Sequence, residues 1–212
     1  TQKNAIAVSC VNNKPRKGNI YTLYNDISNR HKVYSNLIDK ALYKNKTSMV
    51  LFPTVRQSGD FKKQLSNNIS SVLYHSNMTT TERYQMWNDV RFNKYQVVVG
   101  TRPTVFAPIQ NLGLIIIDQS ENFGYKEDQL SRYHSVAVAR KLSELTGANL
   151  VLGSLVPSLD TYYYEKITKY QQITNNKLQI TNNKSIKQII NLSNQKNKLI
   201  SWELEQAIQS TL

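Results

Sequence analysis

The sequence predicts a doubly wound α/β domain, in which a mostly parallel sheet is flanked by helices. Fully apolar segments of strand length recur as QVVVG (96–100), LGLIIID (112–118) and ANLVLGS (148–154), a pattern typical of strands buried on both faces. Segments with apolar residues at helical spacing lie between the strands. The connections are short, so strands and helices alternate as they do in parallel α/β sheets.

The first half of the chain supplies two helices and two strands of this domain. Apolar residues repeat at helical spacing from Val33 to Leu42, which predicts an amphipathic helix over residues 31–45. SMVLF (48–52) is an apolar run stopped by Pro53 and is expected to be a buried strand. A second helix is predicted over 59–69 and a strand over 71–75. Residues 1–20 show no clear period and are expected to be an irregular lead-in.

The second half continues the alternation. Thr79 and Glu82 have the spacing of a capping box, which predicts a helix from there to about Arg91. The strands at 96–100 and 112–118 follow, and then a helix over 131–145. Gly147 is expected to end that helix, because glycine readily adopts the left-handed conformation of a helix terminus.

The composition of the chain changes beyond about residue 167. The pentad ITNNK occurs at 173–177 and again at 180–184, which favours a polar linker or hairpin over a functional repeat. Residues 171–200 are therefore expected to be a linker with a candidate strand at 186–192. Ser201 caps a predicted final helix, and the absence of a strand after that helix suggests a fragment of a longer protein.

Charge and cysteine content limit the classes of partner and site that the chain can have. The 212 residues carry a formal net charge of +13, which favours a polyanionic partner. The alternative is codon bias in an AT-rich genome, since Lys outnumbers Arg 19 to 8. The lone Cys10 excludes a disulfide framework and a cysteine-built zinc site, and it indicates a reducing, intracellular compartment. No apolar run reaches the ~18 residues that would span a membrane.

Four polar loops follow predicted strands, at 53–56, 100–103, 118–121 and 153–158. Parallel α/β sheets bind ligands beyond the carboxyl ends of their strands, so these loops are expected to meet at one rim. Their Gly, Thr, Arg and Asp residues favour a rim that handles nucleotides and nucleic acid.

Four longer stretches match one helicase family in order. They are ERYQMWNDVRFNKYQVVVGTR, GTRPTVFAPIQNLGLIIID, KEDQLSRYH and VLGSLVPSLDTYY. They resemble the patterns ERxxxWxxIRxGxxxIVIGTR, GTRSALFAPFxxLGLIIVDEEH, YKQxxxPRYH and VLGSATPSLES of the primosomal replication-restart DNA helicases of superfamily 2, the PriA family. The resemblance implies that residues 21–170 form a RecA-like first helicase lobe of the P-loop NTPase type. It also implies that 201–212 begin the second lobe.

The chain departs from this family at the ATPase motifs. The phosphate loop GVTGSGKTEVY of the family corresponds to YNDISNRHKVY (24–34), which has no glycine. Arg30 replaces the lysine, His31 replaces the magnesium-binding hydroxyl, and Ser28 completes this remnant of a nucleotide-binding segment. The DEEH box keeps Asp118 but has Gln119 in place of the catalytic glutamate, and an amide cannot take up a proton near neutral pH. The coupling motif keeps Gly153 and Ser154 and loses its threonine.

The segments that the resemblance directs toward DNA are better preserved. Thr101 and Arg102 offer a hydroxyl and a guanidinium to backbone phosphates. The aromatic-rich loop can stack bases and follow phosphates through Phe123, Tyr125, Lys126, Arg132 and Tyr133. Three alternatives stay open: Tyr133 could pack or cap the next helix, Phe123 could be buried under its own loop, and Arg102 could be an ordinary solvated residue.

The leading hypothesis is a DNA-binding pseudo-ATPase lobe that acts in replication restart without cofactor or metal. It implies single-stranded or forked DNA, single-stranded-DNA-binding protein and other primosome proteins as partners, in the bacterial cytoplasm at the nucleoid and not at a membrane. The first alternative is an active DNA helicase with divergent motifs, for which ATP and Mg²⁺ would be the cofactors. The second is a protein-interaction module that binds neither ATP nor DNA.

Overall fold

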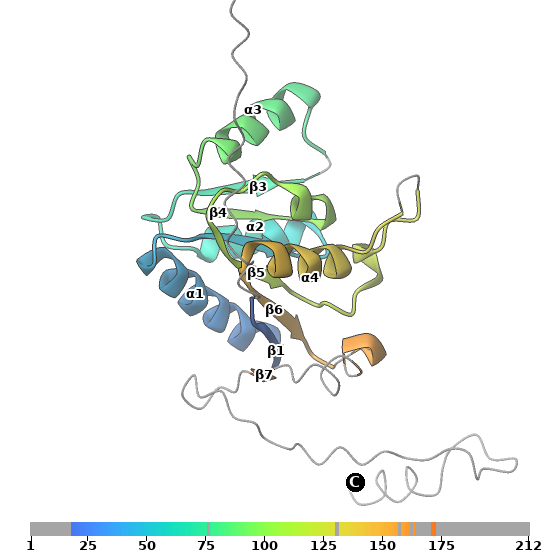
Figure 1. Ribbon diagram of the computed structural model, residues 1–212. Helices are drawn as coiled ribbons and strands as arrows, with labels where there is room; N and C mark the ends of the chain where they lie inside the picture. Colours follow the sequence, from blue (N-terminus) through green and yellow to red (C-terminus); the bar gives the residue numbers. More distant parts are fainter. Residues whose placement is uncertain are drawn as a thin grey trace, which may run out of the picture. The chain divides into compact units, whose positions relative to one another are not determined.

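The computed structural model describes residues 18–75, 77–129, 132–156, 158–161, 163 and 171–172. In this part of the chain the strands form one sheet, in the order β3-β4-β2-β5-β6-β1-β7 (Figure 1). Every pair of neighbouring strands is parallel. The strands are β1 (Ile20–Tyr24), β2 (Thr47–Leu51), β3 (Ser71–Tyr74), β4 (Val97–Gly100), β5 (Leu112–Ile117), β6 (Asn149–Ser154) and β7 (Gln171–Gln172). The predicted α/β class is confirmed.

Helices pack on both faces of the sheet. They are α1 (Ile27–Tyr43), α2 (Val55–Gln64), α3 (Thr80–Arg91) and α4 (Ser135–Thr146), with the 3₁₀ turns η1 (Arg102–Phe106) and η2 (Phe123–Tyr125). The helices α1 and α2 bury Tyr34, Ile38 and Phe61 in one core cluster, and α3 and α4 contribute to the other. Within β2, Met49 packs in one cluster and Val50 in the other, because successive side chains of a strand point to opposite faces.

Each predicted helix among the described residues is present, with shifted ends. The helix α1 begins four residues before the predicted start, directly after the polar pair Asn25 and Asp26. The helix α2 also begins earlier, because Thr54 caps it by accepting a hydrogen bond from the Gln57 backbone N–H. The helix α4 begins only at Ser135. The capping box of α3 is confirmed, with both of its hydrogen bonds formed between Thr79 and Glu82.

Strand β1 was not predicted, because IYTLY mixes polar and apolar residues without a clear period. It pairs with β6, which lies about 130 residues further along the chain, and β7 lies on its other side. The short strand β7 falls at the start of the predicted linker. The remaining predictions for 173–200 and 201–212 lie outside the described residues. No helix in the described part of the chain has the length and apolar character needed to cross a membrane.

Candidate functional site

The turn between β1 and α1 is two residues long. Asn25 and Asp26 lie between the strand and the first residue of the helix, Ile27. The Asn25 backbone N–H donates to Ser154 O, and the Asp26 N–H donates to the Asn25 side chain. A loop that holds phosphates wraps them with several successive N–H groups. Both N–H groups of this two-residue turn are already paired, so the turn itself offers no run of free N–H groups.

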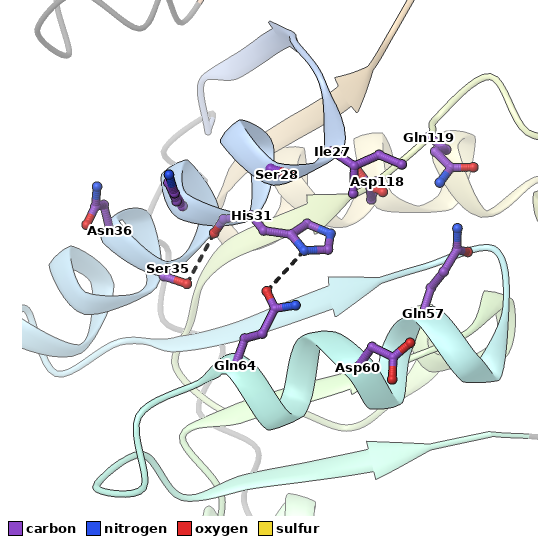
Figure 2. Close-up of a pocket in the computed structure, with 11 residues that line it drawn as sticks. Ile27, Ser28, His31, Ser35, Asn36, Gln57, Asp60, Gln64, Asp118 and Gln119 are labelled. Carbon is purple, nitrogen blue, oxygen red and sulfur yellow. Dashed lines mark hydrogen bonds between the residues drawn. The ribbon is translucent and has the colours of Figure 1, made fainter.

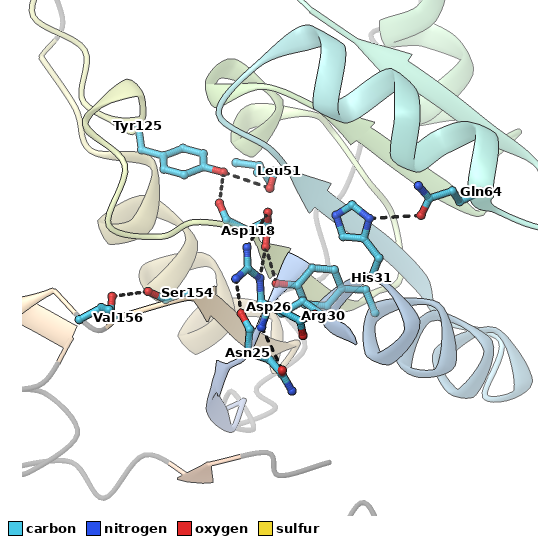
Figure 3. Close-up of polar contacts among 11 residues, drawn as sticks. Asn25, Asp26, Arg30, His31, Leu51, Gln64, Asp118, Tyr125, Ser154 and Val156 are labelled. Carbon is cyan, nitrogen blue, oxygen red and sulfur yellow. Dashed lines mark hydrogen bonds and ion pairs between the residues drawn. The ribbon is translucent and has the colours of Figure 1, made fainter. Parts of the chain in front are cut away.

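Arg30 and Asp118 form a buried ion pair at the carboxyl end of the sheet (Figure 3). The Arg30 Nε donates to Asp118 Oδ1 over 2.7 Å, and Nη2 donates to Oδ2 over 3.3 Å. The third nitrogen, Nη1, donates to the Asn25 carbonyl over 2.5 Å. Both residues are about 1% exposed. The guanidinium from the phosphate-loop segment is therefore bound to the carboxylate of the metal box.

Two buried tyrosines complete this cluster. The Tyr34 hydroxyl, one turn along α1 from Arg30, donates to Asp118 Oδ1 over 2.8 Å. The Tyr125 hydroxyl donates to the Asp118 backbone carbonyl over 2.6 Å, and the Leu51 carbonyl lies 3.1 Å from it. Asp118 thus connects α1, β2 and the aromatic-rich loop. We call Arg30, Tyr34, Asp118 and Tyr125 the Asp118 cluster.

Gly153 of the coupling motif leaves room for this cluster. A Cβ atom at Gly153 would lie 1.6 Å from the Tyr34 hydroxyl, so only glycine lets β6 approach the ring so closely. Its neighbour Ser154 is buried, and the Ser154 hydroxyl donates to the Val156 carbonyl. Both residues of the predicted coupling motif therefore have structural contacts.

The pKa shifts in the cluster agree with one ion pair beside two neutral phenols. Burial alone would lower the pKa of Arg30, but the hydrogen bond and charge of Asp118 raise it overall. Burial, reinforced by the negative charge of Asp118, raises the pKa of Tyr34 and of Tyr125 well above the ordinary value for a phenol. Arg30 therefore neutralises the charge of Asp118 from within the fold.

The other residues of the nucleotide-binding remnant line an open hollow of about 820 Å³ between α1 and α2 (Figure 2). Ser28 is exposed, and His31 is half-buried with its Nδ1 3.2 Å from Gln64 Oε1. Gln119 borders the same hollow, in a left-handed backbone conformation with φ of 49°. The structure therefore separates Arg30, which points to Asp118, from Ser28 and His31, which face this hollow.

A second hollow, of about 480 Å³, lies at the predicted DNA-binding rim. Thr101 and Arg102 both line it, and Thr101 is largely buried. The Arg102 guanidinium donates from Nη2 to Glu127 Oε2 over 2.5 Å and from Nη1 to the Lys126 carbonyl over 2.8 Å. Glu127 was not singled out from the sequence, although it stands where the family pattern YKQxxxPRYH has glutamine.

The aromatic-rich loop divides into exposed and buried residues. Phe123 is 92% exposed, which excludes burial under its own loop, and Lys126 and Arg132 are also exposed. Tyr125 is 0% exposed, so its ring cannot reach a base as predicted. The η2 turn directs Tyr125 inward, and its buried hydroxyl is satisfied by backbone carbonyls.

Tyr133 is half-buried and packs edge-on against Phe106, with ring centroids 4.9 Å apart. Burial raises the pKa of Tyr133, while the charge and hydrogen bond of Arg102 oppose this shift. Phe106 is not singled out by any signal in the sequence. It is about half exposed, although its FAP stretch has the apolar character of a core segment.

The described residues do not fit a magnesium nucleotide. Asp118, which the resemblance implies as the magnesium carboxylate, has both oxygens hydrogen-bonded to Arg30 and Tyr34.

No protein-family model matches the chain. The chain is 34% identical over 137 residues to the replication restart protein PriA of Bacillus subtilis, an alignment that covers 64% of the chain and 17% of that protein. It is 30% identical over 181 residues to PriA of Rickettsia prowazekii, covering 82% of the chain and 26% of that protein. The chain thus spans about a quarter or less of the length of these relatives.

Among solved structures, the fold is similar to that of Saccharomyces cerevisiae Dbp5. One structure of Dbp5 L327V bound to RNA and ADP BeF3 matches with a TM-score of 0.53 and 15% identity, over 74% of the chain and 39% of that protein. A second, bound to Nup159, Gle1 H337R, IP6 and ADP, matches with a TM-score of 0.51 and 16% identity, over 73% of the chain and 43% of that protein. At this level of identity the similarity concerns the fold alone. The fold is RecA-like, and by its sequence similarity to these relatives the chain belongs to the PriA family of replication restart proteins.

Proposed function

We propose that this chain is a DNA-binding lobe of a replication-restart protein that neither binds nor hydrolyses ATP. The observation that carries the proposal is the buried Arg30–Asp118 pair next to a two-residue β1–α1 turn. A chain that hydrolyses ATP needs this carboxylate free for Mg²⁺ and this turn open for phosphates.

The chemistry of the substituted residues supports the loss of hydrolysis. A lysine ammonium is a compact charge that can reach the terminal phosphates, whereas the planar fork of Arg30 binds both oxygens of one carboxylate. Gln119 offers an amide where a general base is required, and losing such a base lowers a rate by about 10²–10⁴-fold. The two changes affect separate steps, namely binding of the phosphates and activation of water.

Exposed groups at the rim support DNA binding. Phe123 presents its ring to solvent, and Lys126 and Arg132 lie on the same loop. An exposed ring can stack on a base, and nearby cations can follow the phosphates of one strand. The net charge of +13 adds attraction for any nucleic acid. We therefore propose single-stranded or forked DNA as the partner.

Two measurements on the 212-residue chain test the proposal. Calorimetric titration with Mg²⁺ and ATP is expected to give no heat of binding, and a coupled assay with forked DNA is expected to give no hydrolysis. DNA-stimulated hydrolysis that disappears in the Asp118→Ala variant would instead favour an active helicase.

The experiment that tests DNA binding compares two variants, each of which removes one exposed aromatic ring. Phe123→Ala is expected to weaken binding to a labelled forked oligonucleotide by about 1–3 kcal/mol, the usual contribution of one stacked base. Tyr43→Ala is the control, because Tyr43 is equally exposed, at 92%, but ends α1 away from the rim. Equal binding by both variants would exclude Phe123 from the interface. No binding by the wild-type chain would favour the protein-interaction module.

A further inference from the structure

We infer that Glu127 competes with DNA phosphate for Arg102, so that this carboxylate lowers the affinity of the rim for single-stranded DNA. The inference rests on the proposed DNA-binding function. It concerns how that function is restrained.

Two nitrogens of the Arg102 guanidinium are already hydrogen-bonded, while the third, Nε, is buried without a hydrogen-bond partner among the described residues. Nη2 is 2.5 Å from Glu127 Oε2, and Nη1 donates to the Lys126 carbonyl. A phosphate binds arginine through the same pair of N–H groups as a carboxylate does. A phosphate can therefore take the place of the carboxylate at Nη2 only if Glu127 leaves.

The backbone holds the Glu127 carboxylate in this place. The Glu127 N–H donates to the Tyr133 carbonyl over 2.8 Å, and the neighbouring residues Lys126 and His134 form an antiparallel bridge. The second carboxylate oxygen, Oε1, accepts from the Gln129 N–H over 3.2 Å. Because both oxygens and the backbone are fixed, the carboxylate is a preorganised ligand for Arg102.

The pair lies where a DNA strand is proposed to pass. Arg102, Glu127 and Tyr133 line the 480 Å³ hollow together with Thr54 and Thr101. The next acid along the chain, Asp128, is different: it is exposed and lies 3.7 Å from the Lys126 ammonium. Only Glu127 of these two neighbouring acids contacts the arginine of the rim.

The test compares Glu127→Gln with Asp128→Asn in the 212-residue chain. Each variant removes one negative charge, but only the first weakens the contact with Arg102. Glu127→Gln is expected to bind a fluorescent single-stranded oligothymidylate about two- to fivefold more tightly, the range expected when a partly exposed ion pair no longer competes. Its plot of log affinity against log salt concentration is expected to be steeper by about 0.7, the slope of one additional phosphate contact on a single strand.

Asp128→Asn and the double variant Arg102→Gln/Glu127→Gln complete the design. Asp128→Asn removes one charge from the loop and loosens only the long, exposed contact with Lys126, so its increase in affinity should be smaller than that of Glu127→Gln. In a chain that already carries Arg102→Gln, adding Glu127→Gln should change the affinity for the oligonucleotide no more than Asp128→Asn changes it in the wild-type chain. Circular dichroism of each variant confirms that it is folded.

Three outcomes overturn the inference. If Glu127→Gln binds the oligonucleotide no better than the Asp128→Asn chain, the carboxylate does not compete with phosphate. If it binds more weakly than wild type, Glu127 instead orders the loop for DNA. If neither the wild-type chain nor Glu127→Gln binds, the proposed DNA-binding function is overturned as well.

Discussion

The proposed loss of ATP binding rests on what Arg30 contacts. An arginine in a phosphate-loop segment could have remained exposed and met a phosphate. Here it is buried and forms two hydrogen bonds with Asp118, whose other neighbours include the Tyr34 hydroxyl. A buried charge is tolerated only when it is paired and hydrogen-bonded, so neither residue can be released at low cost.

The first prediction concerns neutralisation of Asp118. Asp118→Asn leaves Arg30 buried without a counter-charge, and it is expected to lower the free energy of unfolding by about 3–5 kcal/mol. Urea denaturation at neutral pH measures the change. Asp60→Asn is the matched control: Asp60 is an exposed acid that borders the 820 Å³ hollow, and its loss should change stability by less than about 0.5 kcal/mol. An Asp118→Asn chain as stable as wild type would mean that the ion pair with Arg30 does not stabilise the fold.

The second prediction concerns alkaline pH. The pKa values of Tyr34 and Tyr125 are raised in the folded state, whereas in the unfolded chain both phenols ionise near pH 10. The protein is therefore expected to have the full stabilisation below about pH 10 and to lose it as the pH rises further, by about 1.4 kcal/mol per pH unit for each tyrosine. Denaturation midpoints measured across this range test the expectation. Tyr34→Phe should reduce the slope of the free energy of unfolding against pH by about half. An unchanged slope would mean that the Tyr34 hydroxyl does not cause this pH dependence.

At the scale of secondary-structure elements, the positions of the helix ends determine which side chains reach the Asp118 cluster and the 820 Å³ hollow. Beginning α1 at Ile27 converts the phosphate-loop counterpart into helix, which points Arg30 and Tyr34, four residues apart, to one face. Thr54 caps α2, which begins at Val55, and so brings Gln57 beside the hollow. The local sequence contains the cap of α2, yet the prediction placed this helix four residues too late, because its first turn has few apolar residues to mark a period.

The third prediction tests the best-defined helix end. Thr79→Ala removes the side chain that accepts from the Glu82 N–H, and it is expected to cost about 1 kcal/mol in free energy of unfolding. Thr80→Ala is the control, since Thr80 is an exposed residue inside the first turn and the capping box is formed by Thr79 and Glu82. Thermal unfolding of both variants checks the prediction. Equal melting temperatures would mean that the capping box does not stabilise α3.

At the scale of the whole molecule, the net charge of +13 acts on any polyanion. Codon bias can produce such a charge, but the electrostatic attraction does not depend on its origin. Binding that neutralises phosphates releases counterions from the DNA, so the affinity falls linearly with salt on a logarithmic plot.

The fourth prediction follows from this charge. The affinity of the 212-residue chain for forked DNA is expected to fall by roughly 10³-fold between about 50 and 200 mM salt, the decrease expected for about six phosphate contacts. Fluorescence anisotropy at a series of salt concentrations measures the slope. Phe123→Ala should bind more weakly at every concentration with the same slope, because phenylalanine carries no charge. A salt-independent affinity would exclude phosphate contacts as the main source of binding.

The amino-acid sequence by itself determined the fold class, the confirmed capping box of α3 and the family, because apolar periodicity, helix caps and motif order are local patterns. It also located the departures at Arg30 and Gln119. Only the tertiary structure decided what these residues contact. Arg30 and Asp118 are 88 residues apart, and Arg102 and Glu127 are 25 residues apart, so no local period relates them. The inward position of Tyr125 has the same cause, because its partners lie on β2 and at the end of β5 and become neighbours only when the parallel sheet forms.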